Sequence, residues 1–139
     1  MRVVAVLIAS AALAACASSH PIEPRLAPAS VDFTAAAVQR VELSNFDFNP
    51  REIRLRAGRP YTLVLANVGS GGHDFAAPEF FAAAQVRASD AAMVASGKIE
   101  VAGGTSEQVH LVPAAGEYDL VCTHTGHALL GMKGRIIVE

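Results

Sequence analysis

Residues 118–139 read YDLVCTHTGHALLGMKGRIIVE. One cysteine, two histidines and one methionine fall within eleven positions, from Cys122 to Met132, between two strand-like segments. Thiolate and thioether sulfurs are soft metal donors and imidazole nitrogen is borderline, so together they suit copper in both of its oxidation states. The stretch therefore predicts a copper site on the connection between two β-strands.

A copper site of the blue type has two histidines and one cysteine in a trigonal plane and a distant axial methionine. The stretch supplies Cys122, one histidine and Met132, so the second histidine must come from elsewhere. His73 is the candidate, because it follows the flexible glycine-rich loop of residues 69–72, which itself follows an apolar strand. In a β-sandwich the loops of both sheets gather at one end, where His73 and Cys122 can meet.

The stretch offers two histidines, His124 and His127, and the residues around them favour His127. Thr125-Gly126 is a turn signal, and Gly126 tolerates a positive φ, so the chain can bend and return His127 toward the sulfur. His124 is the alternative, since it shares a face with Cys122 in an extended strand. That chelate would leave His127 idle and strain the plane. We therefore expect His124 to be a solvent-exposed loop residue beside the metal.

These residues also carry a resemblance to a known family. The pattern N-x-G-x-x-x-H-D-F around His73, followed by Y-D-L-V-C-T-x-x-G-H-x-x-x-G-M-x-G-x-I, closely resembles the cupredoxins, and more narrowly blue copper proteins of the azurin and auracyanin type. The resemblance covers about residues 41–139. It implies a Greek-key β-sandwich that carries one electron on one type 1 copper, and it assigns the ligands as His73, Cys122, His127 and Met132.

The resemblance implies supporting contacts as well. In cupredoxins the residue after the first histidine ligand commonly hydrogen-bonds the residue after the cysteine, so Asp74 and Thr123 are expected to link the two loops. Such partners orient the ligands and tune the metal. The Gly72 carbonyl is a candidate for a weak further contact with the metal. The chain departs from many relatives at Thr125, where they have proline, and residues 78–96 match no part with an assignable function.

From residue 38 onward, the chain reads as short strands separated by turn signals. Residues 78–96 are alanine-rich and lack β-branched runs, so we expect one or two short helices there. The prediction is an all-β domain over residues 38–139, an antiparallel β-sandwich or Greek-key barrel with a short helical excursion. Of these two, the resemblance to the cupredoxins implies the Greek-key β-sandwich. The seven strands are expected within residues 38–48, 52–58, 60–69, 98–103, 106–113, 116–122 and 134–139.

The first fifteen residues have the pattern of an export signal. Arg2 precedes an apolar run that is too short to span a bilayer as a helix, and the run ends at Leu13-Ala14-Ala15-Cys16. Small residues followed by cysteine resemble the bacterial lipobox, in which the signal is cut before a cysteine that is then lipidated. An ordinary secretory signal is the alternative. We expect a signal in residues 1–15, then lipidated Cys16 and a flexible tether to residue 37.

The cysteine count supports a metal ligand. The chain has two cysteines, and if Cys16 carries lipid, Cys122 is the only thiol and no internal disulfide can form. An exported thiol is exposed to oxidation, and ligation would protect it. Zinc is disfavoured because methionine is a poor ligand for it, and a thiol hydrolase would need the thiolate free.

The expected function is that of a periplasm-facing, lipid-anchored electron carrier in the bacterial cell envelope. Its expected partner is a cytochrome or another copper protein, with no small-molecule substrate. The net charge of −2 and the absence of a basic run argue against nucleic acid. A periplasmic copper chaperone or resistance protein is the alternative. An enzyme is not expected, because copper oxidases need further copper ligands between domains.

Three other residues able to bind metal are given structural positions. His20 falls in the expected tether, and His110 falls in an alternating strand segment that places it on a sheet face. Met93 falls in the helical excursion and is expected to pack in the core.

Overall fold

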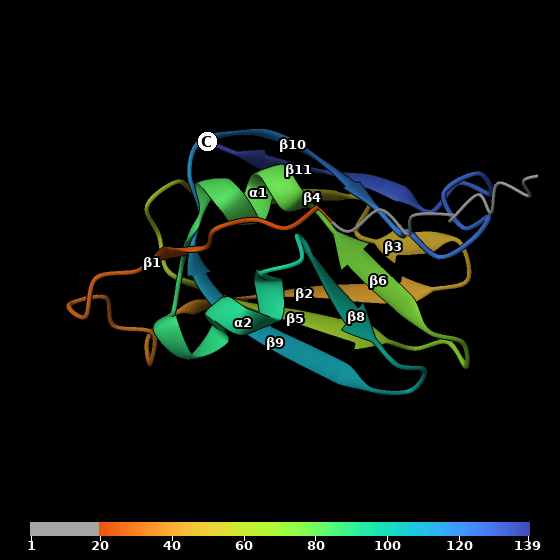
Figure 1. Ribbon diagram of the computed structural model, residues 1–139, viewed down its shortest axis with the longest axis horizontal. Coiled ribbons are helices and arrows are strands. Elements are labelled where there is room, and N and C mark those ends of the chain that lie inside the picture. The colour runs from red at the N-terminus through yellow and green to blue at the C-terminus, as the bar shows by residue number, and fades with distance from the viewer. Residues whose placement is uncertain (1–19) are drawn as a thin grey trace, which may run out of the picture.

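The computed structural model describes residues 20–139, which form a sandwich of two β-sheets (Figure 1). The expected signal in residues 1–15 and the expected lipidation of Cys16 lie outside the described residues. The six-stranded sheet contains, in spatial order, β1 (Arg25–Leu26), β7 (Gln85–Val86), β9 (Ser106–Val112), β5 (Tyr61–Asn67), β2 (Ala37–Ser44) and β3 (Asp47–Asn49). The five-stranded sheet contains β4 (Glu52–Leu55), β11 (Lys133–Val138), β10 (Gly116–Val121), β6 (His73–Ala76) and β8 (Lys98–Val101).

The predicted all-β sandwich is confirmed, but its sheets are mixed rather than antiparallel. Strand β2 pairs with β5 in parallel, and β4 pairs with β11 in parallel. Between β2 and β5 the chain crosses to the other sheet through β4 and then returns. It therefore re-enters beside β2 in the same direction, which a simple hairpin cannot achieve.

The core lies between the two sheets and follows the alternation of the strands. In β2, Val41 and Leu43 are fully buried, as are Val109 and Leu111 in β9. The residue between the last two, His110, is half-buried on the outer face of the sheet, as predicted. There it bonds the buried carboxylate of Asp90 through both its backbone nitrogen and its ring.

Asp90 is held as a charged group by these contacts. Burial by itself raises the pKa of this carboxyl, but hydrogen bonds from Arg87, His110 and Ser89 outweigh burial. The pKa of Asp90 is consequently lower than usual. Its bonds tie the helical excursion to β9.

The helical excursion is present as predicted. It contains α1 (Pro78–Ala83), a 3₁₀ turn η1 (Ala88–Asp90) and α2 (Ala91–Val94), with β7 between the first two. Pro78 begins α1, where a missing N–H leaves no helical bond unmade. The expectation that Met93 packs in the core is wrong. Met93 is 36% exposed, because the single turn of α2 presents Val94 to the core instead.

The segment before β2 differs from the flexible tether that was expected. The Ile22 nitrogen donates to the Ala95 carbonyl at 2.9 Å, and β1 pairs with β7 in parallel. Further along, the ring of Phe33 meets that of His110 edge-on at 5.9 Å. A sheet edge such as β7 has unpaired backbone groups, which this segment satisfies without any hydrophobic periodicity.

Three strands of the two sheets, β1, β6 and β7, were not predicted from the sequence. In addition, one predicted strand is interrupted. A turn at Asn45-Phe46 separates β2 from β3, and Phe46 has a φ of 63°. Strand β6 matters most, because it begins at His73 and lies between β10 and β8. Within residues 20–139, no helix combines the length and apolar character that crossing a membrane requires.

Candidate metal centre

The four predicted ligands come from one end of the sandwich. His73 is the first residue of β6, Cys122 directly follows β10, and Met132 directly precedes β11. His127 lies in the loop between the last two. The side chains of His73, Cys122 and Met132 are fully buried, whereas His127 is half-buried.

Three of the donor atoms converge on one point. The Nδ1 atoms of His73 and His127 lie 3.2 Å apart. The Cys122 sulfur lies 3.5 Å from Nδ1 of His127 and 4.0 Å from Nδ1 of His73. Two imidazole nitrogens and one sulfur thus face each other from two separate loops, which is the trigonal donor set predicted for copper.

Backbone hydrogen bonds lock the loop that carries the other ligands. The Met132 nitrogen donates to the His127 carbonyl at 2.9 Å, and the Cys122 nitrogen donates to the Met132 carbonyl at 3.1 Å. The predicted turn is present, since Gly126 has a φ of 81°. Gly131 has a φ of 103°, so a second glycine bends the chain back just before Met132. Three ligands are therefore set by one closed loop.

The titration of the donors also fits a metal site. Burial raises the pKa of the Cys122 thiol. Burial lowers the pKa of His73, and the neighbouring His127 and His124 lower it further. Without metal the thiol is protonated and His73 is neutral, so an imidazole lone pair is available. Metal binding must displace the thiol proton. The buried Nε2 of His73 has no hydrogen-bond partner among the described residues.

His124 is directed away from the donor set. Its Nε2 lies within hydrogen-bond distance, 2.6 Å, of a carboxylate oxygen of Glu100. The His124 side chain is 32% exposed and is held by Glu100. It is therefore only partly exposed, whereas the sequence analysis expected a solvent-exposed residue. His127 is the ligand, which answers the choice that the sequence left between the two histidines.

Asp74 links the two ligand loops, as the resemblance implied. The Thr123 nitrogen donates to Oδ1 of Asp74 at 2.7 Å, and the Thr123 hydroxyl donates to Oδ2. The backbone nitrogen of Asp74 in turn points at the Cys122 sulfur, 3.5 Å away. Lys98, which the sequence analysis missed, donates to Oδ2 of Asp74 at 2.9 Å.

Asn67, at the end of β5, organises the glycine loop that leads to His73. Its side-chain nitrogen donates to the carbonyls of Gly71 at 2.8 Å and Val101 at 2.9 Å. Its side-chain oxygen accepts from the Gly69 nitrogen at 3.0 Å. Asn67 is the first letter of the pattern quoted above, but its role depends on contacts that a sequence does not reveal. The Gly72 carbonyl contact stays a prediction.

An apolar rim surrounds this end of the molecule. It consists of side chains that are large, apolar and exposed: Phe46 (36%), Val68 (59%), Leu129 (90%) and Leu130 (62%). The Phe46 ring meets the His127 ring edge-on, with centroids 5.3 Å apart.

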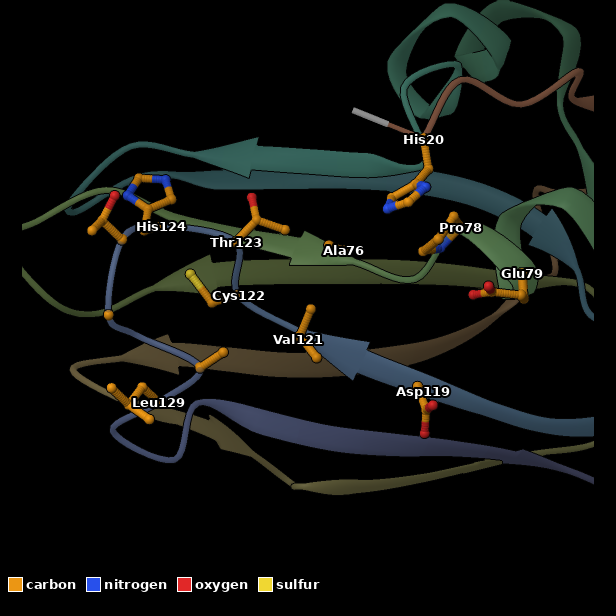
Figure 2. A pocket seen from close by; sticks show the side chains of 13 residues that line it. His20, Ala76, Pro78, Glu79, Asp119, Val121, Cys122, Thr123, His124 and Leu129 are labelled. Atoms are coloured by element: carbon orange, nitrogen blue, oxygen red, sulfur yellow. The ribbon is translucent and has the colours of Figure 1, made fainter. Parts of the chain in front are cut away.

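A pocket of about 610 Å³ opens beside the cysteine. Figure 2 shows His20 and Pro78 on one side of it, Leu129 on another, and Cys122 with Thr123 between them. Cys122 is one of the residues that line this pocket, although its side chain is fully buried.

With this geometry established, the chain can be placed in a family. It belongs to the copper-binding proteins of the plastocyanin/azurin family, whose sequence model matches residues 35–139. The cupredoxin assignment is thereby confirmed, and the bound cofactor is copper in a type 1 site. A sequence search of curated proteins found no match.

Solved structures support the fold. Auracyanin B aligns with a TM-score of 0.59 at 21% identity, covering 88% of this chain and 99% of its own. Auracyanin A, a "blue" copper protein from Chloroflexus aurantiacus, aligns with a TM-score of 0.51 at 20% identity, covering 74% and 100%. The multicopper oxidase McoA from Aquifex aeolicus aligns with a TM-score of 0.62 at 17% identity, covering 83% of this chain and 31% of the oxidase.

Proposed function

We propose that this protein is a one-electron carrier that works in the bacterial periplasm. The observation that carries the proposal is the preassembled donor set, with two imidazole nitrogens and a sulfur 3.2 to 4.0 Å apart. Bound copper supplies a one-electron change between Cu(I) and Cu(II). Ligands held by the fold rather than by the metal keep the same geometry in both states, which lowers the barrier to electron transfer.

A closed site favours a carrier over the copper chaperone. An acceptor that takes copper must reach and replace the ligands, yet His73, Cys122 and Met132 are fully buried. Only His127 reaches toward the surface, and Phe46 covers one edge of its ring. An electron can be transferred through the His127 ring, whereas a copper ion cannot leave without displacing its ligands. An enzyme is disfavoured because the auracyanins span the same single domain, whereas the chain matches only part of McoA.

The apolar rim is the proposed docking surface for a redox partner. It has four exposed apolar side chains, and one of them, Phe46, contacts the half-buried His127 ring. Exposed apolar clusters on soluble domains mark interaction sites. A cytochrome or a second copper protein with an apolar patch around its own cofactor would bring the two redox centres close, and such weak contact allows fast release.

We further propose that the protein is anchored by lipid at Cys16 and faces the periplasm. The support is the signal-like run that ends in small residues before that cysteine. Ile22 is hydrogen-bonded to the domain, and six residue steps separate it from Cys16. Even fully extended, these span only about 20 Å. The copper domain would accordingly work close to the membrane surface.

The test is the colour of the copper-loaded full-length protein. Cu(II) should produce an intense thiolate-to-copper absorption band that one-electron reduction removes and reoxidation restores. Cys122→Ser should abolish the band. The matched control, Cys16→Ser, should keep the band and lose the lipid, which mass spectrometry and detergent-phase partitioning detect. A colourless Cu(II) complex would refute the proposed function, and an unmodified Cys16 would refute only the anchor.

The carrier and chaperone functions are separated by competition. Reduced protein should pass its electron rapidly to an oxidised cytochrome while it retains copper against a moderate Cu(I) chelator. Rapid loss of copper to the chelator, together with slow electron exchange, would favour the chaperone.

A further inference from the structure

Strand β8 provides no metal ligand, yet two of its side chains reach the cysteine loop. Lys98 lies opposite Ala76 of β6, and Glu100 lies opposite Asp74. The Lys98 ammonium donates to Thr123 Oγ1 at 2.9 Å, in addition to Asp74. Glu100 holds His124. β8 thus contacts both residues that follow Cys122, across the strand that delivers His73.

The Asp74 carboxylate is fully buried, so its charge needs compensation. Among the described residues, Lys98 is the cation that forms an ion pair with it, at 2.9 Å. The Lys98 side chain is itself 28% exposed. Removing one member of a buried pair leaves an uncompensated charge in a medium of low polarity, where its field reaches further than in water.

This charge lies close to the metal ligands. Asp74 directly follows His73 in the chain, and its backbone nitrogen points at the Cys122 sulfur. A copper(II) site carries one more positive charge than a copper(I) site. An unbalanced carboxylate nearby therefore stabilises the oxidised form more than the reduced form, and the reduction potential falls.

We propose that Lys98 is a positioning residue that sets the reduction potential of the copper site. Its ammonium offsets the charge of the Asp74 carboxylate and donates to Thr123, so the cysteine loop and the His73 strand stay linked and the Asp74 charge behind the sulfur is balanced. This inference rests on the proposed electron-carrier function, because it concerns the potential at which the carrier works.

The ammonium stays charged where the protein works. The hydrogen bond to Asp74 raises the pKa of Lys98, and this outweighs the opposing effect of burial. A cation at neutral pH is what the proposed balance requires. The same cation makes the nearby cluster of Asp74, Glu100 and His124 unsuitable for a second metal ion, since a metal would have to displace Lys98 from Asp74.

The test compares reduction potentials of copper-loaded full-length variants by redox titration of the visible band. Lys98→Met and Lys98→Gln should both lower the potential, whereas Lys98→Arg should stay near the wild type. Asp74→Asn should raise it, and the double variant Asp74→Asn/Lys98→Met should return toward the wild type. The glutamine variant keeps a hydrogen-bond donor, so it separates charge from bonding and serves if the methionine variant does not fold.

Lys133→Met is the matched control, because it removes one positive charge from an exposed residue next to Met132. Solvent screens that charge, so a smaller shift is expected than for Lys98→Met. A second readout is the free energy of unfolding of metal-free protein. Comparison of Lys98→Met, Asp74→Asn and the double variant with the wild type should give a favourable coupling energy between Lys98 and Asp74.

The outcomes are distinct. A wild-type potential in Lys98→Met and Lys98→Gln, in protein that is blue, overturns this inference and leaves the proposed function intact. A shift in Lys133→Met as large as that in Lys98→Met overturns it as well, because any nearby charge would then suffice. Wild-type protein that forms no blue copper site overturns the proposed function and this inference with it.

Discussion

Replacement of Asn67 by alanine should destabilise the protein more than any other single polar change at the glycine loop. Asn67 is 2% exposed and makes three hydrogen bonds, two as donor and one as acceptor. A typical hydrogen bond contributes about 1 kcal/mol net, and alanine leaves the buried partners without a replacement. The expected loss is therefore about 3 kcal/mol from the free energy of unfolding.

The measurement is urea unfolding of the metal-free protein. With a denaturant slope of about 2 kcal/mol per molar urea, a loss of about 3 kcal/mol lowers the midpoint by about 1.5 M. The control Gln108→Ala removes an exposed amide from β9 and should change the stability by less than about 0.5 kcal/mol. If the urea midpoint of Asn67→Ala decreased by less than about 0.5 M, the hydrogen bonds of Asn67 would not be what holds the loop. Copper affinity should fall too, because the loop leads directly to His73.

Three further predictions concern the site, its surface and its stability. His127→Ala should bleach or strongly shift the visible band, while His124→Ala should leave the band nearly intact; the reverse would reassign the ligand. Leu129→Glu should slow electron exchange with a cytochrome at least several-fold without loss of copper, whereas Val38→Glu, which charges an equally apolar but distant exposed position, should not; equal slowing would discount the rim. Asp90→Asn should lower the stability of metal-free protein at pH 7. Because the pKa of Asp90 is depressed by folding, its stabilising effect is present above the usual carboxyl range and lost as pH falls through the folded-state pKa. Acid unfolding of the asparagine variant should therefore show a shallower dependence on pH, and an unchanged profile would contradict this.

The ligands could be predicted from the sequence because the chemistry of a copper site restricts its residue types. Cys122, His127 and Met132 lie close together in the chain, so spacing alone relates them. The choice of His127 over His124 rested on the spacing of the family motif and on the turn at Gly126, which the structure contains. Within this one loop, the residue types, their spacing and the glycine turn all indicated the same donors.

What could not be predicted depends on contacts between distant segments. Lys98 reads in the sequence as one charged residue of an alternating strand, and its bond to Asp74 exists only because β8 pairs with β6. The packed segment before β2 was mistaken for a tether for the same reason. It has no hydrophobic periodicity, and it is ordered by the free edge of β7.

The pairing of the strands that hold the copper ligands explains why a few polar side-chain contacts have a large effect on the geometry of the site. Strands β10 and β11 are paired along their length and hold the three C-terminal ligands as one unit. Strand β6, which delivers His73, pairs with β10 only between Ala76 and Val121, but pairs with β8 over all four of its residues. The distance from His73 to Cys122 is therefore set mainly by side chains, by Asp74 bridging to Thr123 from one side and Asn67 bracing the glycine loop from the other. Because the sheet itself constrains this distance weakly, a change in either residue should alter the copper geometry before it alters the fold.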